Sequence, residues 1–446
     1  MNTPICDFVK KYADKNSVRL HMPGHKGKSF MGFEQFDITE VEGADVLYNA
    51  QGIIKESMEN ASALFSTART LYSTEGSSLS IRAMLYLAAM YAKEQNIKPV
   101  VLAGRNAHKA FLSGAALNDI EVDWIYPEED EGLLSLNLSA EKLKAYLENY
   151  DEKPVALYVT SPDYLGNTLD IKALSALCKE NNMLLLVDNA HGAYLSFLPK
   201  NQHPIALGAD ICCDSAHKTL PVLTGGGYLH ISKSAPEIFK TQAEFALSLF
   251  ASTSPSYLIL ESLDLANRYM AEGYKEKLMA FAEKVGDLKK ALTDNGYTLF
   301  GNEALKITIS AKKYGYTGVA LADILSKNGI VCEFADPDFL TLMLTPENSD
   351  TDLNKLKEVL LSVKKREAIK SPCPKVDRLK KALSIKDALF SFSTEVSAKD
   401  ALGKTLASYS VSCPPAIPVA ICGEVLNESA VNAFEYYGVE KIRIIN

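Results

Sequence analysis

The 446-residue sequence lacks the features that mark several large classes of protein. No stretch approaches the roughly 20 apolar residues that a membrane-spanning helix needs, and no charged-then-apolar N-terminal segment ends in a cleavage site. Basic residues are not in excess, because 47 Lys and Arg face 55 Asp and Glu for a net charge of -8. Nucleic acids and anionic membranes attract basic surfaces. We therefore expect a cytoplasmic protein that binds neither nucleic acid nor membrane.

Cysteine is also scarce, with 8 residues scattered along the chain. The one close pair, Cys212 and Cys213, is adjacent and lacks the two-residue gap of a zinc knuckle. We expect reduced thiols that mostly fill the core, and no metal site. Repeats and low-complexity segments are absent as well, which leaves a chain long enough for two or three globular domains.

Helical patterns and apolar runs alternate through the middle of the chain. Apolar residues recur at helical spacing over Ile81–Tyr91, and Pro99 ends that helix. Short apolar runs at Val100–Leu102, Val155–Val159 and Met183–Val187 are typical of buried strands. Such strands separated by amphipathic helices predict an α/β fold with a mostly parallel sheet covered on both faces. In a sheet of this kind, binding and catalytic residues gather at the carboxyl ends of the strands.

The same patterns divide the chain into four parts. Residues 1–50 are interpreted as an N-terminal arm, 51–260 as a large domain, 261–370 as a small α/β domain and 371–446 as a C-terminal domain. The elements predicted outside the large domain are a helical stretch over about 257–295, strands Lys306–Ser310, Phe339–Leu344, Pro418–Ile421 and Lys441–Ile445, and helices Val319–Ser326 and from Asn427.

The first candidate element is the tripeptide Gly76, Ser77 and Ser78, directly before a helix predicted to begin near Leu79. A helix N-terminus presents free N–H groups and a positive dipole end, and small hydroxyl residues let a phosphate approach them. Serine before a helix is more often an ordinary N-cap, and for this tripeptide alone that interpretation is favoured. Only the combination with other elements makes it a candidate phosphate site.

The second element is Asp188, which follows the apolar run Met183–Val187. A carboxylate at this position can salt-bridge a protonated pyridine nitrogen and so keep the ring an electron sink. Ala190 is small enough to let a flat ring lie close, and the His191 imidazole can reach an oxygen substituent of the ring. The alternative is an aspartate that merely opens a turn after a strand, which is common.

The third element is Ser215, Ala216, His217 and Lys218, after a short apolar run and before a glycine triplet at 225–227. A lysine beside an apolar strand is desolvated, which lowers its pKa and makes the amine nucleophilic toward an aldehyde. Most lysines are surface charges, but this one has an adjacent histidine and serine. The three elements together are far more specific than any one of them.

At these positions the chain resembles the Orn/Lys/Arg decarboxylase family of fold-type I pyridoxal 5'-phosphate (PLP) enzymes, in a short form without the N-terminal wing domain. The resemblance runs through nearly the whole chain. It rests on the blocks His21-Met22-Pro23-Gly24-His25-Lys26, Gly52-Ile53-Ile54-Lys55-Glu56, Asn106-Ala107-His108-Lys109, Ser161-Pro162-Asp163-Tyr164-Leu165-Gly166, Ser215-Ala216-His217-Lys218-Thr219-Leu220 and Ser252-Thr253-Ser254-Pro255-Ser256-Tyr257.

The resemblance implies a role for each matching residue. Lys218 would be the Schiff-base lysine, Asp188 the partner of the pyridine nitrogen, and His108 the residue stacked on the ring, with Ala190 on the other face. Lys218 and His217 are the candidates for returning a proton to Cα. The phosphate would be bound by Ser77, Ser78, Ser215 and His217, with Gly76 and His191 also at the cofactor and with Thr253 or Ser254 contributed by a neighbouring subunit.

The activity implied is decarboxylation of a basic amino acid, arginine, lysine or ornithine, to an amine and CO2 in polyamine metabolism, by a homodimer with shared sites. The substrate region departs from the family. Ser408 stands where many relatives have a glutamate, and Cys413 where they have a tyrosine, whereas Glu424 is retained as a candidate for the distal substrate cation. Two alternatives stay open, another fold-type I activity of aminotransferase or aldolase type, and a PLP-binding protein without turnover.

Overall fold

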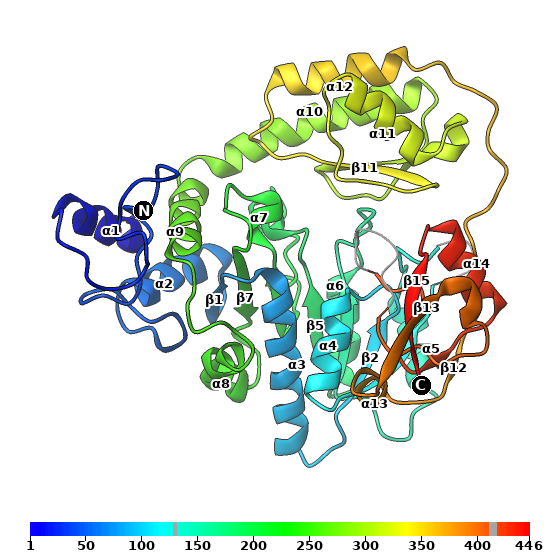
Figure 1. Ribbon diagram of the computed structural model, residues 1–446, viewed down its shortest axis with the longest axis horizontal. Helices are drawn as coiled ribbons and strands as arrows, with labels where there is room; N and C mark the ends of the chain where they lie inside the picture. Colours follow the sequence, from blue (N-terminus) through cyan, green and yellow to red (C-terminus); the bar gives the residue numbers. More distant parts are fainter. Residues whose placement is uncertain (128–131, 410–416) are drawn as a thin grey trace. The chain divides into compact units, whose positions relative to one another are not determined.

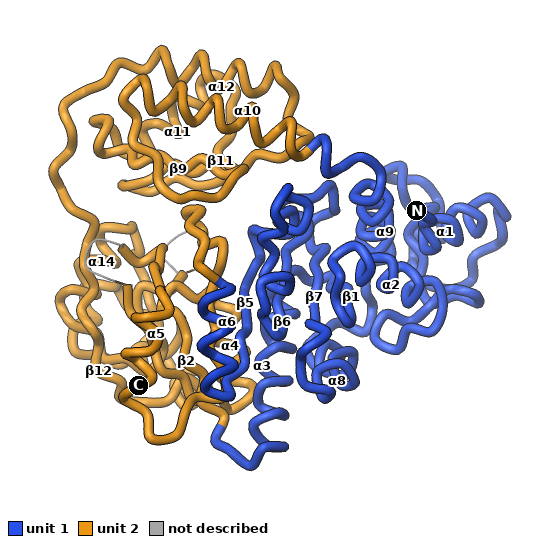
Figure 2. The backbone as a smooth tube through the Cα atoms, turned by 180° about the vertical axis from the view of Figure 1, so that it is seen from behind, with its two compact units in different colours: residues 1–98, 171–277 blue, residues 99–170, 278–446 orange. Residues whose placement is uncertain are grey.

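The computed structural model describes residues 1–127, 132–409 and 417–446 (Figure 1). The chain forms two compact units, each made from two separate stretches of sequence (Figure 2). Unit 1 contains residues 1–98 and 171–277, and unit 2 contains residues 99–170 and 278–446. This division follows contacts in space and not the order of the sequence, so it does not test the domain boundaries predicted near residues 50, 260 and 370.

Four strands of unit 1 pair in the order β1, β7, β6, β5. β5 and β6 are parallel, whereas β7 is antiparallel to both β6 and β1. Helix α3 packs against these strands and α8 packs on α3, which places the helix N-terminus of α3 beside the strand ends (Figure 1). The elements are α1 Pro4–Asp14, α2 Ile53–Phe65, β1 Arg69–Ser73, α3 Gly76–Glu94, α6 Ile171–Glu180, β5 Leu184–Asp188, β6 Ile211–Asp214, α7 Ala216–Thr219, β7 Gly227–Ile231, α8 Glu237–Ser248 and α9 Tyr257–Ala271, with 3-10 turns η1 Leu47–Asn49 and η2 Ala193–Phe197.

The predicted elements of unit 1 differ from the structure at two points. Helix α3 begins at Gly76 rather than near Leu79, because the positive φ of 66° at Gly76 lets the chain turn directly from β1 into the helix. The helical stretch predicted over 257–295 is two helices, since Gly273, with a φ of 81°, separates α9 from α10 (Tyr274–Asp294). Asp188 is the last residue of β5, as predicted.

Within the predicted arm, residues 4–14 form the amphipathic helix α1. Asp264 of α9 accepts hydrogen bonds from the backbone N–H groups of Ile5 and Cys6, at 3.0 and 3.1 Å. A carboxylate at this end of a helix satisfies free N–H groups and meets the positive end of the helix dipole. The arm is therefore attached to α9 by its first helical turn.

Three strands of unit 2 pair in parallel, in the order β4, β2, β3. A separate antiparallel sheet has the order β10, β11, β9, β8. Most of α10 also belongs to this unit. The elements are β2 Val100–Gly104, α4 Lys109–Leu117, β3 Glu121–Ile125, α5 Ala140–Leu147, β4 Ala156–Thr160, β8 Leu299–Phe300, β9 Lys306–Ser310, η3 Ala311–Tyr314, α11 Gly318–Lys327, β10 Phe334–Ala335, β11 Phe339–Met343 and α12 Asp350–Ser362.

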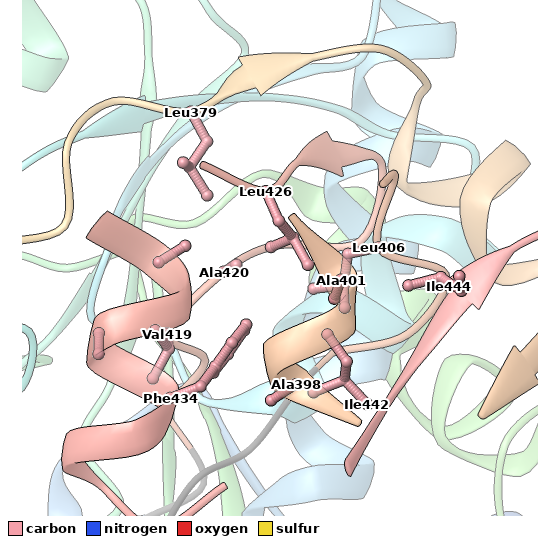
Figure 3. Packing of buried hydrophobic residues seen from close by; sticks show 12 residues of the cluster. Leu379, Ala398, Ala401, Leu406, Val419, Ala420, Leu426, Phe434, Ile442 and Ile444 are labelled. Atoms are coloured by element: carbon pink, nitrogen blue, oxygen red, sulfur yellow. The ribbon is translucent and has the colours of Figure 1, made fainter. Parts of the chain in front are cut away.

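The C-terminal part of unit 2 has its own apolar core around Phe434 and Leu406 (Figure 3). The strand predicted at Pro418–Ile421 is wrong. Proline lacks the N–H that a strand ladder needs, and the carbonyls of Pro418 and Val419 accept instead from the Arg105 guanidinium at 2.9 and 3.0 Å. The elements here are β12 Lys380–Lys381, α13 Ile385–Leu389, β13 Ser393–Ser397, η4 Ala398–Ala401, β14 Glu424–Val425, α14 Glu428–Tyr436 and β15 Lys441–Ile445.

The sequence predicted no membrane-spanning helix and no paired cysteines, and both points can be compared with the described residues. Across 1–127, 132–409 and 417–446, no helix combines the length and the apolar character needed to span a bilayer. The seven cysteines within these ranges are free thiols, and Cys212 and Cys213 are fully buried. Cys413, together with the Pro414-Pro415-Ala416 motif, lies outside the described residues.

Candidate active site

Lys218 lies on the short helix α7, immediately after β6. Its Nζ is 3.1 Å from Nε2 of His191, which follows β5. Both histidine and lysine therefore reach one point from the carboxyl ends of neighbouring parallel strands, as expected for a mostly parallel sheet. His191 is buried and Lys218 is half-buried. An imidazole nitrogen at this distance can share a hydrogen bond with the amine and so fix the position of Nζ.

Asp188 ends β5 and is 2% exposed. Its Oδ1 accepts a hydrogen bond from the backbone N–H of Ala190 at 3.1 Å, and the Cys213 thiol lies 3.6 Å from the same oxygen. The short turn after β5 thus holds the carboxylate in place with main-chain geometry. A buried carboxylate of this kind is suited to bind a protonated ring nitrogen.

The candidate phosphate site is built at the N-terminus of α3. Ser215 donates a hydrogen bond to Ser77 Oγ at 2.9 Å, and both side chains are buried. Ser78, one residue further into the helix, is half-buried. Two hydroxyls and the free N–H groups of a 19-residue helix therefore meet at one end of the unit 1 strands.

The glycine triplet at 225–227 packs against this helix start. Gly76 N–H donates to the Gly225 carbonyl at 2.6 Å. A Cβ on Gly225, where φ is 101°, would lie 2.7 Å from the Thr74 carbonyl, and one on Gly227 would lie 2.9 Å from that of Asp214. These contacts explain why no residue with a side chain fits at these two positions.

His217 is oriented by the same loop. Its Nδ1–H donates to the Gly226 carbonyl at 2.9 Å, which leaves Nε2 as an acceptor. Burial lowers the pKa of His217, and the charge of Lys218 lowers it further. The neutral imidazole is therefore the form expected at neutral pH.

Thr253 and Ser254 are exposed in the loop between α8 and α9. The neighbouring Ser252 N–H donates to Glu75 Oε1 at 2.8 Å, and Ser254 N–H donates to Ser252 Oγ at 3.2 Å. The loop is thus tied to the residue before α3. That Thr253 or Ser254 binds the cofactor phosphate of a neighbouring subunit stays a prediction.

In unit 2, His108 is the N-cap of α4, and its Nδ1 accepts from the Ala110 N–H at 3.1 Å. Glu424 is 5% exposed and lines a cavity of about 530 Å³ together with Arg105 and Tyr126. Its Oε2 accepts from the Ile421 N–H at 2.7 Å and lies 3.8 Å from the Arg105 guanidinium. Burial raises the pKa of Glu424, and Arg105 opposes that shift. Stacking by His108 and substrate binding by Glu424 stay predictions.

Arg105 is the residue that sequence reasoning missed. It is 4% exposed and follows β2, so its position at a strand end was the available signal. Leu406, from the stretch that leads to Ser408, pairs with Glu424 through a backbone hydrogen bond of 2.9 Å. The segment that leads to Ser408 and the segment that carries Glu424 are therefore neighbours in the structure.

A family described as "Orn/Lys/Arg decarboxylase, major domain" matches residues 3–310. The chain belongs to the Orn/Lys/Arg decarboxylase family. It is 29% identical to an arginine decarboxylase of Bacillus subtilis (strain 168), covering 96% of this chain and 92% of that protein. It is 28% identical to an arginine decarboxylase of Halalkalibacterium halodurans, covering 96% and 91%.

Solved structures extend the family likeness to the fold. The Francisella novicida lysine decarboxylase matches with a TM-score of 0.79 at 18% identity, covering 100% of this chain and 81% of that chain. Lysine decarboxylase A from Pseudomonas aeruginosa matches with a TM-score of 0.81 at 16% identity, covering 99% and 80%. The predicted family and fold-type I class are confirmed.

The residues of unit 1 fit the cofactor on which this family of enzymes depends, PLP. The paired hydroxyls of Ser77 and Ser215 at a helix start suit its phosphate, and the buried carboxylate of Asp188 suits its pyridine nitrogen. Thr219, directly after Lys218, has a buried Oγ1 without a hydrogen-bond partner among the described residues. A buried hydroxyl of this kind is satisfied when a polar ligand is bound beside it.

Proposed function

We propose that this chain is a PLP-dependent decarboxylase of a basic amino acid, with arginine as the first substrate to test. The observation that carries the proposal is the contact of Lys218 with His191 beside the end of β5, in a chain whose full-length relatives include arginine decarboxylases. Aminotransferase or aldolase activity and binding without turnover are not favoured, because the same relatives match 96% of the chain.

In this proposal Lys218 binds PLP covalently, Asp188 holds a proton on the pyridine nitrogen, and Ser77 with Ser215 anchors the phosphate. When bound, PLP supplies the electron sink for the pair released as CO2 leaves. His191 shares a hydrogen bond with the Lys218 amine and so positions it toward the cofactor. Lys218 and His217 are the candidates for delivering the proton that replaces the carboxylate at Cα.

The working form is proposed to be a cytoplasmic homodimer in polyamine metabolism. The support for shared sites is the loop that carries Thr253 and Ser254, which is exposed in the single chain and lies beside Glu75, the residue before α3. An exposed hydroxyl loop next to a candidate phosphate site is placed to serve a second copy of the chain.

The test is a product screen of the PLP-loaded full chain with arginine, lysine and ornithine, read as CO2 released and as amine by mass spectrometry. We expect one amine in molar balance with CO2, and none from Lys218→Ala, because that variant lacks the amine that binds the cofactor. Lys233→Ala is the lysine control, because Lys233 is an exposed residue just after β7. Formation of an oxo acid without CO2 would contradict the proposal.

A further inference from the structure

A second cluster of chemically active side chains is buried beneath the strand ends of unit 1, and the proposed reaction does not use it. It consists of His203, Asp214 and His230, whose ligand atoms all lie within 4.8 Å of one another. Asp214 Oδ2 is 3.1 Å from Nε2 of His203 and 3.1 Å from Nε2 of His230. All three side chains are 0% exposed. No sequence pattern predicts this cluster, because its residues are widely spaced and follow no metal-binding motif.

Cys212 is a further donor close to one member of the cluster, although its thiol lies outside the group whose ligand atoms are all within 4.8 Å of one another. Cys212 is fully buried, and its Sγ is 3.9 Å from Nε2 of His203. Four ligands at the ordinary zinc bond lengths of 2.0–2.3 Å lie roughly 3.3–3.7 Å from one another in a tetrahedron. The separations of 3.1 Å from Asp214 to each histidine are close to that range. Cys212 is 3.9 Å from His203 but outside the 4.8 Å group, so its side chain must turn toward the other donors to complete a tetrahedron.

Two of the donors, Asp214 and His230, have outer hydrogen bonds of the kind that orient metal ligands. Asn189 donates to Asp214 Oδ1 at 2.6 Å, which leaves Oδ2 to face both imidazoles. Nδ1 of His230 is 2.9 Å from the Thr70 hydroxyl, so Nε2 is the nitrogen turned toward the carboxylate. The ring of Phe65 packs on both histidines, with centroids 5.4 and 4.5 Å away, and closes the cluster from solvent.

Charge also favours an ion. Asp214 is fully buried and faces two imidazoles, and a buried carboxylate needs a cationic partner. A divalent ion bound to one carboxylate, one thiolate and two neutral imidazoles gives a site with no net charge. On binding, each imidazole moves its proton from Nε2 to Nδ1, and the Cys212 thiol releases its proton to solvent.

We propose that His203, Asp214, His230 and Cys212 form a structural site for a divalent transition metal, with zinc as the ion that best fits nitrogen, oxygen and sulfur donors. Asp214 directly precedes Ser215, and Asn189 directly follows Asp188. The ion would therefore join β6, which carries Cys212 and Asp214, to β7, which carries His230, next to residues of the candidate cofactor site. It takes no part in bond breaking.

The test is metal analysis of the full chain produced in zinc-supplemented medium and dialysed against chelator. We expect about one zinc per chain in the wild type, and less than about 0.1 in Asp214→Asn and in His230→Asn. His25→Asn is the matched control, because His25 also pairs with an aspartate, Asp37 at 3.2 Å, but outside the cluster. Full zinc in Asp214→Asn, or less than about 0.1 zinc in the wild type, would overturn the proposal.

X-ray absorption at the zinc edge keeps the proposal testable if these variants do not fold. The wild type should show nitrogen or oxygen neighbours at about 2.0–2.1 Å with imidazole scattering, and one sulfur at about 2.3 Å that is lost in Cys212→Ala. A zinc shell without imidazole, or one with two or more sulfurs, would show that the ion is bound elsewhere.

Discussion

At the scale of single residues, the candidate site depends on side chains that main-chain groups hold in place. Asp188 is held by the Ala190 N–H, and His217 by the Gly226 carbonyl. A group fixed by backbone loses little conformational entropy when a ligand binds, so more of the interaction energy is available for affinity and orientation. Substitutions at these positions should therefore alter chemistry more than folding.

Asp188→Asn tests this separation. We expect the variant to keep PLP, because the phosphate contacts at α3 are unchanged, and to lose at least about 100-fold in kcat, or ~2.7 kcal/mol of barrier, because an amide does not hold the ring nitrogen protonated. Asp210→Asn is the matched control, since Asp210 accepts from Leu185 N–H at 2.8 Å at the opposite end of the same strand. The measurements are kcat and bound PLP. A kcat near the wild-type value would remove Asp188 from its role.

Glu424→Gln tests whether Glu424 binds the substrate or only pairs with the buried Arg105. Loss of the charge should raise the KM for the basic substrate about tenfold, or ~1.4 kcal/mol, with unchanged PLP affinity. It should also lower the melting temperature, because Arg105 is left buried without its carboxylate. KM and melting temperature are measured together. A lower melting temperature with an unchanged KM would make Glu424 only the partner of Arg105.

Sequence patterns predicted those site residues that follow a recognisable local signal. Lys218, Asp188 and Ser77 each stand at the end of an apolar run or at a helix start, and all three lie in unit 1 at such positions. The position of Arg105 after β2 was its only local signal, and His203 has none, because their partners are a carbonyl pair near residue 418 and an aspartate at the end of β6. Long-range pairing of this kind is set by the packed fold rather than by spacing.

At the scale of elements, α9 illustrates how packing overrides local pattern. Its carboxyl-bearing residue Glu261 is half-buried, and its Oε1 has no hydrogen-bond partner within the described residues. Burial raises the pKa of Glu261 to about 8, and the charges of Asp37 and Asp264 raise it further. The folded chain therefore binds a proton here that the unfolded chain releases above its ordinary pKa of 4.5.

Glu261→Gln should consequently change how stability depends on pH. For the wild type, unfolding releases this proton between pH 4.5 and about 8, so the folded state loses stability as the pH rises through that window. We expect the variant to melt at a higher temperature than the wild type at pH 8.5 and at a similar temperature at pH 4.5. Glu237→Gln, on an exposed position of α8, is the control. Equal differences at both pH values would exclude the mechanism.

The ends of helices and strands were predictable where a local signal, such as a proline or a short apolar run, marks them. Pro99 precedes β2, and β9 has the predicted bounds Lys306–Ser310. The strand expected at Pro418–Ile421 failed because side-chain donors from Arg105 satisfy its carbonyls. β1 and β7 were not predicted, since their burial comes from pairing with each other and with β6.

At the scale of the whole molecule, shared sites make a prediction about mixed subunits. A Lys218→Ala chain and a Thr253→Ala/Ser254→Ala chain should each be inactive alone. After subunit exchange, half of the dimers are hybrids with one intact site of two, so roughly a quarter of the wild-type activity should return. Native mass spectrometry checks that hybrids have formed. Hybrids that are present and inactive would show that the two sets of residues do not meet across subunits.

The hydrogen bonds between Asp264 and the start of α1 also set an order of events during translation. The carboxylate that receives the first helical turn lies 259 residues further along the chain, which at about 5–20 residues per second is a delay of roughly 13–52 s on the ribosome. During that interval α9 has not been made, so the apolar side chains of Ile5 and Val9 on α1 can pack only against α2. The first helix to leave the ribosome is thus secured only after residue 264 has been made, and it is the segment that chaperones and proteases of the translating cell meet first.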